Sequence, residues 1–453
     1  MTERQIIMRH AGTVLVGQLA VMAFGITDTW VAARYADTAL AALSVASATY
    51  ITVHISLMGI LQALLPVWAE LHGANRPRDL GRSVHQALYL WLLTSLLAVW
   101  LLLSPGPLLH WTGVPEALQH DVRDYLAIVA IAAPASLLFR LYGTLNQALG
   151  KPKLVTWLQV GALAVKVPMS LLLVMGWPGV IEPMGLAGCA WATVAVNHLM
   201  LLAAVLLLRQ SDFYQPYGFW RPMARPHWPT LSMFVRVGLP SGLAIGVEVT
   251  SFTLVALFVA RLGTVASASH QIMANMAAVL YMVPLSLSIA SSARISQWLG
   301  AGQAQRARHS LKTGLQLVLA TSVLLALAIG LGREQIASFY TPSALVLPVA
   351  TLMLGWLTLY HVVDAVQVFL VFALRSYRVT VLPLVIYTIM LWGVGLAGGY
   401  GLAYAHWPWV SATALAVASP LSFWQAAIVA LTLTCMVLGP KLWRSSRQAV
   451  ASL

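Results

Sequence analysis

Charged residues are scarce in this chain. Asp, Glu, Lys and Arg together make up 9% of its 453 residues, whereas a soluble domain carries about 25%. So few charges could not cover the surface of a soluble protein of this length, which excludes a water-soluble fold. Acidic residues are rarer than basic ones, with 13 Asp and Glu against 26 Lys and Arg. An acidic residue inside an apolar stretch is therefore a candidate functional residue.

Cysteine is almost absent as well. Cys189 and Cys435 lie far apart, each inside an apolar stretch, without the spacing of a metal site. We interpret both as small packing residues. The net charge of +13 comes from basic residues scattered in short loops, without a dense basic block. The sequence therefore predicts no nucleic-acid partner and no cofactor.

Apolar residues dominate instead, at 60% of the chain, and the mean hydropathy is +0.81. Apolar stretches of about 20 residues, the length needed to cross a bilayer core, recur throughout. Only helices and closed barrels satisfy the backbone in lipid, and the alternating pattern of a barrel is missing here. We expect an all-α integral membrane protein with spans near 13–33, 40–64, 86–104, 122–146, 155–176, 185–208, 233–260, 266–290, 313–332, 346–374, 379–402 and 421–440.

Basic residues divide unequally between the loops. One alternate set of loops holds 20 of the 26 Lys and Arg, and the other set holds four. The richer set consists of Arg4, Arg9, Arg76, Arg78, Arg82, Lys151, Lys153, Arg209, Arg221, Arg225, Arg236, Arg294, Arg306, Arg308, Lys312, Arg375, Arg378, Lys441, Arg444 and Arg447. Because cytoplasmic loops are enriched in Lys and Arg, we expect both termini to be cytoplasmic, which requires an even number of spans.

The chain also repeats itself. A shift of 227 residues places Ala33 and Arg34 on Ala260 and Arg261, and Gly73 on Gly300. Six spans per repeat keep the two halves in the same orientation, so a pseudo-two-fold axis along the membrane normal would relate them. We expect an N-lobe at 1–209 (spans 1–6), a polar, Pro-rich cytoplasmic linker at 210–229 and a C-lobe at 230–453 (spans 7–12).

Three acidic residues lie well inside predicted spans: Asp28, Glu248 and Asp364. A charge at the centre of a membrane helix costs about 2.5–3.5 kcal/mol on insertion scales, and such groups usually face the bundle interior and mark ion or proton pathways. Each carboxylate could exchange a proton or supply oxygen ligands to a small cation, with Na⁺ at Glu248 and Asp364 as one possibility. A structural role in hydrogen bonding between helices is the alternative.

Two basic residues also lie within spans. Lys166 stands in the middle of span 5, where a lysine needs a partner or contact with water. Arg140 in span 4 is either a structural counter-ion or part of a polar cavity.

Other candidates could line a cavity for a flat organic cation. Trp30, Tyr281, Met282 and Tyr360 offer aromatic or polarizable surfaces, although ordinary packing is the alternative for each. His361 could shuttle protons or hydrogen-bond between helices.

Three stretches resemble a known family. They are GITDTWVAARYADTALAALSVA at 25–46, the region from VGLPSGLAIGVEVTSF at 237–252 into ASASHQIMANMAAVLYMVPLSLSIASSARISQWLGAG at 266–302, and HVVDAVQVFLVFALRSYRV at 361–379. In these three stretches the chain resembles the multidrug and toxic compound extrusion (MATE) family. Within that family it resembles the NorM-type branch, which is marked by two acidic residues in the C-lobe. The resemblance covers nearly the whole chain.

The resemblance implies two six-helix lobes around a V-shaped central cavity. It also implies antiport, in which a proton or Na⁺ enters while a lipophilic, mostly cationic organic compound leaves. The family's coupling acids match Asp364, Glu248 and Asp28. A monomer in the bacterial cytoplasmic (inner) membrane is the further expectation.

One departure from the family pattern concerns span 5. Its usual amide or acidic residues, which would face Asp28, are replaced by Lys166 and Ser170, while Thr193 in span 6 keeps the expected polar type. An ammonium at ion-pair distance from Asp28 would neutralise the carboxylate and repel a second cation. We therefore favour coupling to protons, or coupling through Glu248 and Asp364 alone.

Two alternatives stay open at this point. A flippase or exporter of a lipid-linked or anionic precursor could share the architecture, but its cavity should be rich in Arg and Lys. A membrane enzyme would need a concentrated catalytic motif in an interfacial loop, and the loops offer none that is recognisable.

Overall fold

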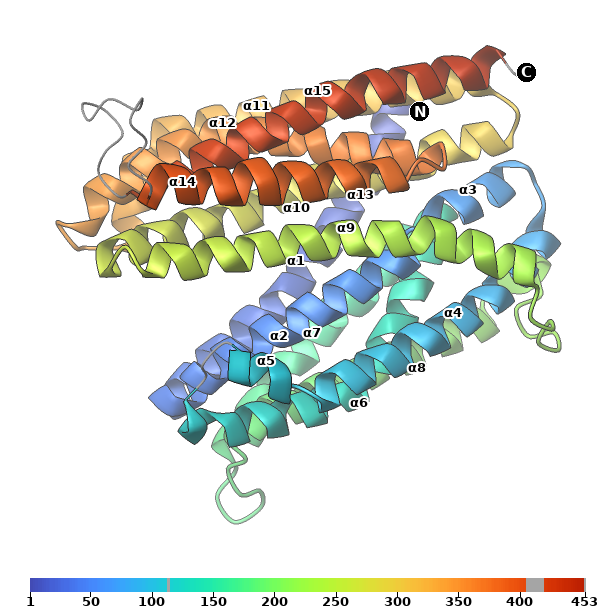
Figure 1. Ribbon diagram of the computed structural model, residues 1–453. Coiled ribbons are helices and arrows are strands. Elements are labelled where there is room, and N and C mark those ends of the chain that lie inside the picture. The colour runs from blue at the N-terminus through green and yellow to red at the C-terminus, as the bar shows by residue number, and fades with distance from the viewer. Residues whose placement is uncertain (112–114, 405–418, 452–453) are drawn as a thin grey trace. The chain divides into compact units, whose positions relative to one another are not determined.

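The computed structural model describes residues 1–111, 115–404 and 419–451 (Figure 1). In those ranges the regular structure is helical, with a lone bridge between Trp177 and Ile181. The helices are α1 (Glu3–Tyr35), α2 (Asp37–Gln62), α3 (Leu65–Gly73), α4 (Pro77–Leu103), α5 (Gly106–Trp111), α6 (Glu116–Ala148), α7 (Pro152–Met175), α8 (Leu186–Gln210), the 3₁₀ helix η1 (Asp212–Tyr217), α9 (Trp228–Ala260), α10 (Thr264–Gly300), α11 (Ala304–Tyr340), α12 (Val346–Ser376), α13 (Val381–Tyr387), the π-helix η2 (Thr388–Ala397), α14 (Gly398–Tyr404) and α15 (Leu421–Ala451).

Twelve helical segments of the described chain are long and apolar enough to cross a membrane, which confirms the predicted all-α fold and span number. Two of them are composite. The second span joins α2 to α3, and the eleventh joins α13, η2 and α14.

Local sequence explains where several spans begin and end. Pro77 and Pro152 open α4 and α7, where the missing N–H would have had no partner in the helix. Gly150 and Gly302 follow α6 and α10 with φ near +70°, a left-handed conformation that ends helices and favours glycine.

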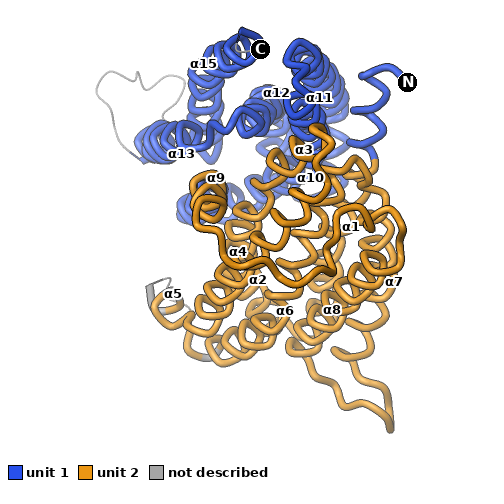
Figure 2. The backbone as a smooth tube through the Cα atoms, turned by 90° about the vertical axis from the view of Figure 1, so that its right-hand side faces the viewer, with its two compact units in different colours: residues 1–12, 243–453 blue, residues 13–242 orange. Residues whose placement is uncertain are grey.

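The described chain divides into two compact units (Figure 2). Unit 2 consists of residues 13–242, and unit 1 consists of residues 243–453 together with 1–12. The divisions fall inside α1 and α9, not in loops. Each helix therefore contributes its two ends to different units.

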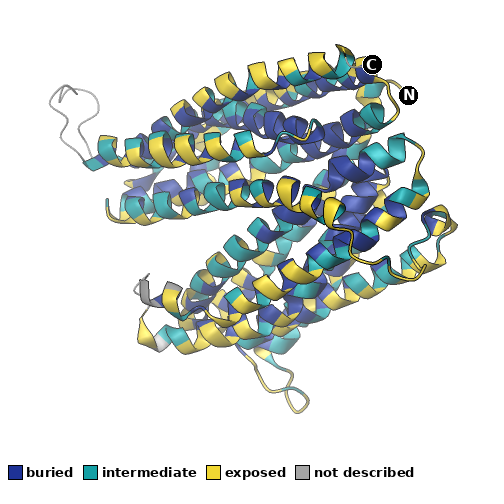
Figure 3. Ribbon diagram, turned by 45° about the vertical axis from the view of Figure 1, so that its right-hand side comes forward, coloured by how far each residue is buried: buried dark blue, intermediate teal, exposed yellow. Residues whose placement is uncertain are grey.

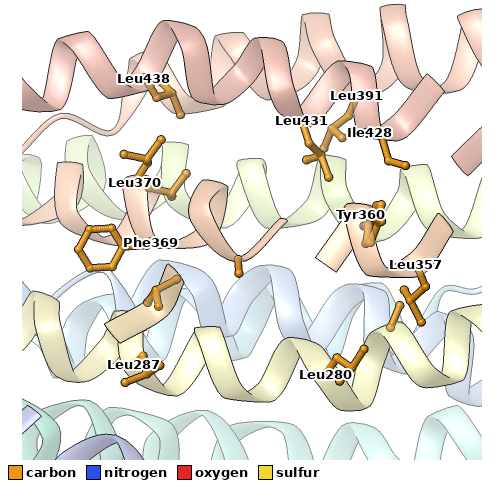
Figure 4. Packing of buried hydrophobic residues seen from close by; sticks show 14 of the residues in the cluster. Leu280, Leu287, Leu357, Tyr360, Phe369, Leu370, Leu391, Ile428, Leu431 and Leu438 are labelled. Atoms are coloured by element: carbon orange, nitrogen blue, oxygen red, sulfur yellow. The ribbon is translucent and has the colours of Figure 1, made fainter. Parts of the chain in front are cut away.

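In each unit one helix is central. In unit 1, α12 packs against α10, α11 and α15, and in unit 2, α6 packs against α8, α2 and α4. These are the fourth spans of their halves and the most buried of each half. Figure 4 shows part of the unit 1 core, in which Tyr360, Leu370 and Leu431 belong to one cluster of buried apolar residues. The internal repeat of the sequence thus has a counterpart in the packing.

The exposed faces of single helices alternate with buried ones (Figure 3). On α4 the exposed side chains include Leu92, Leu93, Leu96 and Trp100. Large apolar side chains on an outward face suit contact with lipid and not with water.

The segment between the two halves of the sequence is held against α4. His85, Gln86 and Tyr89 bond the backbone carbonyls of Phe219, Arg225 and Ala224 at 2.9, 2.9 and 3.1 Å. Residues 210–229 therefore form part of unit 2.

Candidate functional site

Unit 2 contains a buried ion pair. The Lys166 Nζ atom on α7 lies 2.7 Å from the Asp28 Oδ1 atom on α1. Both residues are almost fully buried, with 1% of Lys166 and 7% of Asp28 exposed. Buried charges of this kind persist only where they are paired and hydrogen-bonded.

All three donors of the Lys166 ammonium have acceptors. Besides Asp28, Nζ donates to the Thr193 hydroxyl at 2.7 Å and to the Cys189 carbonyl at 3.1 Å, both on α8. The ammonium group has three N–H donors and no acceptor, so this arrangement satisfies it completely. Ser170 adds a hydroxyl donor to Asp28 Oδ1 at 3.2 Å. The structure thus brings Asp28, Lys166, Ser170 and Thr193 into one cluster, here called the N-unit cluster.

The helix positions explain this convergence. Lys166 and Ser170 are four residues apart, so they share one face of α7. Pro168 between them removes one N–H from the helical ladder and weakens it there. Gly188 lets α8 approach closely, since a Cβ atom there would lie 2.7 Å from the Leu173 and Val174 backbone of α7.

Two other predicted residues of unit 2 lie apart from this cluster. Trp30 is 45% exposed, and the Arg34 guanidinium covers its ring at 4.2 Å. Arg140 on α6 is half-buried, and among the described residues no carboxylate forms an ion pair with it. The positive charge of Arg140 interacts electrostatically with His54. The His54 ring stacks on the Tyr50 ring, with the two ring centroids 5.1 Å apart.

In unit 1 the two predicted acids interact electrostatically. Asp364 on α12 is buried and Glu248 on α9 is half-buried, and the charge of Glu248 acts electrostatically on Asp364. Both carboxylates also act electrostatically on the phenol groups of Tyr281 and Tyr360. We call Glu248, Asp364, Tyr281 and Tyr360 the C-unit cluster. These four side chains come from α9, α10 and α12 and are linked by electrostatic interactions between carboxylate and phenol groups.

Aromatic packing fixes Tyr360. Its ring meets Trp424 edge-on at 4.9 Å, and the Trp424 indole N–H donates to His270 Nδ1 at 3.1 Å (Figure 4 shows Tyr360 in its packing). His361 next to it is buried, and its Nε2 has no hydrogen-bond partner among the described residues. In the part of the chain that the structure describes, no hydrogen bond or ion pair joins His361 or Met282 to the two acids, and Met282 is half-buried on α10.

Arg375 is a residue that sequence reasoning missed. The sequence predicts Arg375 in a loop, whereas in the structure it lies inside α12, is 3% exposed and interacts electrostatically with Glu248, Tyr281 and Tyr387. It follows Asp364 by 11 residues, close to three helical turns, so both lie on nearly the same face. That spacing was the available signal. The amide of Gln367, also buried on α12, lacks partners at both its oxygen and its nitrogen among the described residues.

The oxygen atoms of the C-unit cluster are of the kinds that bind a proton or a hard cation. Among the described residues, no group of three or more His, Cys, Asp or Glu is placed so that it could hold a metal ion. Carboxylate and phenol oxygens are the ligand type that hard cations such as Na⁺ prefer.

The chain matches known proteins along most of its length. The MatE family model matches residues 14–172 and 240–400. The probable multidrug resistance protein NorM of Aromatoleum aromaticum is 35% identical over 433 residues, which cover 96% of this chain and 92% of that protein. The multidrug resistance protein PmpM of Pseudomonas aeruginosa is 30% identical over 448 residues, covering 97% and 91%.

Solved structures show the same fold. The eukaryotic MATE transporter AtDTX14 superposes with a TM-score of 0.87 at 17% identity, covering 99% of this chain and 98% of that one. The Vibrio cholerae MATE transporter VcmN in its bent form gives 0.83 at 17% identity, covering 99% and 97%. These matches confirm the family resemblance of the sequence. The chain therefore belongs to the MatE family, the multidrug and toxic compound extrusion transporters, and is a membrane transporter and not an enzyme.

Proposed function

We propose that this protein is a cation-coupled antiporter, driven by protons in preference to sodium, that exports lipophilic and mostly cationic organic compounds. The observation that carries the proton preference is the Lys166 ammonium, which has a carboxylate, a hydroxyl and a carbonyl oxygen as acceptors. Those three oxygens are ligands that a sodium ion would need. Sodium binding in the N-unit cluster would require the ammonium to leave them.

Coupling then falls to the C-unit cluster. An ionised Asp364 or Glu248 attracts an organic cation strongly, because Coulomb attraction grows as the surroundings lose water. A proton that neutralises the same carboxylate removes this attraction and releases the cation. Each ligand thus weakens the binding of the other, which is the reciprocal coupling that antiport needs. The Tyr281 and Tyr360 rings offer flat surfaces on which a delocalised cation can stack.

The names of the curated relatives support the export of drugs, since both are called multidrug resistance proteins. The excess of basic residues in alternate loops supports cytoplasmic termini in a bacterial inner membrane. We further propose that one chain is the working unit, which sedimentation of the detergent-solubilised protein would test.

The decisive experiment measures efflux of a fluorescent lipophilic cation from proteoliposomes, under a proton gradient and separately under a sodium gradient. We expect the proton gradient to drive efflux from the wild-type protein and the sodium gradient to drive little. Lys166→Asn should gain a response to sodium, because an amide leaves the oxygens of the cluster open to a cation. Asp364→Asn is the inactive control. Sodium-driven efflux by the wild-type protein would refute the proton preference while leaving antiport intact.

A second candidate is the flippase or exporter of an anionic precursor. Arg375 favours it, because a buried arginine that acts on Glu248 adds positive charge to unit 1. The same proteoliposomes distinguish the two. If a labelled anionic lipid is flipped and the cationic dye does not move under either gradient, the result would favour the flippase over the antiporter.

A further inference from the structure

Three cations surround a single tryptophan in unit 1. The Cζ atoms of Arg308 and Arg447 lie 4.5 and 5.8 Å from the centroid of the Trp443 ring, and the Lys312 Nζ atom lies 5.6 Å from it. Arg308 and Lys312 are one turn apart on α11, and Trp443 and Arg447 are one turn apart on α15. We call these four residues the Trp443 cluster. Two helices thus build it from one face each.

The cluster lies where a membrane surface is expected. Trp443 follows the apolar stretch at 421–440 of α15, and Lys312 precedes the one at 313–332 of α11. Tryptophan is enriched at the boundary between lipid and water, where its ring meets the headgroup level. Trp443 is 37% exposed, and Lys312 and Arg447 are exposed, so a molecule from outside can reach them.

No acidic residue balances the cluster. The described part of unit 1 contains four acids, Glu3, Glu248, Glu334 and Asp364. Glu3 is engaged by Arg294, and Glu334 stands 26 residues from Arg308 along α11, about 39 Å at 1.5 Å per residue. Glu248 and Asp364 lie within spans. Among the described residues, no ion pair therefore reaches Arg308, Lys312 or Arg447.

One donor of the cluster is both buried and unused. The Arg308 Nε atom has no hydrogen-bond partner among the described residues. Attraction to the ring contributes only about 0.5–1 kcal/mol per exposed cation. Because all three cations lie within 5.8 Å of one ring centroid, salt with a Debye length of about 8 Å screens their mutual repulsion only in part. An anion held between them would relieve this repulsion and use the free donor.

A phosphate diester at the membrane surface has the matching chemistry. The guanidinium groups of Arg308 and Arg447 can each form two parallel hydrogen bonds to phosphate oxygens. The indole ring fits the glycerol level beside them. We propose that the Trp443 cluster binds the headgroup of an anionic phospholipid. The proposal rests on the membrane setting of the protein and not on its coupling ion or its drug substrate.

The test titrates the purified full-length protein in neutral detergent with phosphatidylglycerol and follows lipid retention by native mass spectrometry. Phosphatidylcholine, which carries no net charge, is the lipid control, and inorganic phosphate tests for a free-anion site. The test variant is Arg308→Gln with Arg447→Gln. The charge-matched control is Lys441→Gln with Arg444→Gln, which removes two cations from α15 outside the cluster. If the test variant does not fold, Lys312→Gln replaces it, because Lys312 is exposed and only one residue is changed.

We expect the test variant to retain phosphatidylglycerol with about 30-fold lower affinity, because each Lys or Arg near the surface contributes about fivefold to anionic-lipid binding. Lys312→Gln alone should lose about fivefold. The control variant should keep its retention, and phosphatidylcholine should be retained weakly by all. Equal retention by test and control variants would overturn the proposal. Displacement of the lipid by millimolar inorganic phosphate would overturn it too, since the cluster would then be a site for free anions.

Discussion

The Lys166 Nζ atom lies 2.7 Å from the Asp28 Oδ1 atom, and the remaining donors of its ammonium are used by Thr193 and Cys189. The cation that neutralises Asp28 is therefore part of the chain itself. Removing one member of a buried pair leaves the other charge without compensation, which is why the pair should be visible in stability as well as in transport.

Lys166→Met should destabilise the protein by about 3–5 kcal/mol, because it leaves Asp28 buried and unpaired. Adding Asp28→Asn should restore most of the loss, since neither charge then remains. Thermal unfolding in detergent would measure both. Ser170→Ala is the matched control and should cost about 1 kcal/mol, for it removes a single hydrogen bond from the same carboxylate. A double variant as unstable as the sum of its single changes would contradict the pairing.

Asp364→Asn should weaken binding of a cationic dye by about 10- to 100-fold, because a charge-assisted contact contributes about 1.5–3 kcal/mol. Binding of a neutral dye of similar shape should change little. Fluorescence polarisation of both dyes on the purified protein gives the comparison. Glu334→Gln, an exposed acid on α11 of the same unit, is the control. Equal losses for the neutral dye would mean that Asp364 supports the shape of the site and not its charge.

Glu3→Ala should release the first turn of α1. Its carboxylate accepts hydrogen bonds from Arg294 at 2.8 Å, from Ser310 at 2.6 Å and from the Trp298 indole at 3.2 Å. Loss of charge-assisted hydrogen bonds at about 1.5–3 kcal/mol each should make trypsin cleavage after Arg4 and Arg9 faster. Mass spectrometry of timed digests measures this. Glu116→Ala, at the exposed start of α6, should leave the rate unchanged.

Gly81→Ala should detach the segment 210–229 from α4. A Cβ atom on Gly81 would collide with the Tyr217 backbone carbonyl, which cannot move as a side-chain tip could. We expect faster trypsin cleavage at Arg221 and Arg225. Gly161→Ala on α7 is the control, because nothing lies within 4 Å of its added Cβ, and removing a helical glycine should stabilise the helix by about 0.5–1 kcal/mol. Unchanged cleavage in Gly81→Ala would show that the contact is not needed for docking.

Much of the fold could be predicted from the sequence because span length and hydropathy act locally. Twelve spans follow from apolar stretches that need no knowledge of their neighbours. The docking of 210–229 could not be predicted. Its contacts run from His85, Gln86 and Tyr89 to backbone carbonyls, and a carbonyl has no signature in the sequence.

The candidate sites divide in the same way. An acid or lysine inside an apolar stretch is conspicuous, so the sequence alone identifies Asp28 and Lys166 as candidate site residues. Arg375 was not conspicuous, because it stands at the end of an apolar stretch where a loop was expected and α12 continues past it. Glu3 and Arg294 are 291 residues apart, and no periodicity connects residues at that separation.

The division of the chain inside α1 and α9 has a further consequence. Residues 1–12 leave the first half of the sequence to join unit 1, and residues up to 242 of the second half join unit 2. Each half of the sequence thus contributes a terminal segment to the unit formed mainly by the other half, which resembles the exchange of elements in domain swapping. A chain cut at 219/220 would yield two fragments, neither of which holds a complete unit. Each fragment would need the segment carried by the other fragment to complete its unit. Co-expressed fragments should therefore reassemble into an active transporter, while either fragment made alone should be degraded.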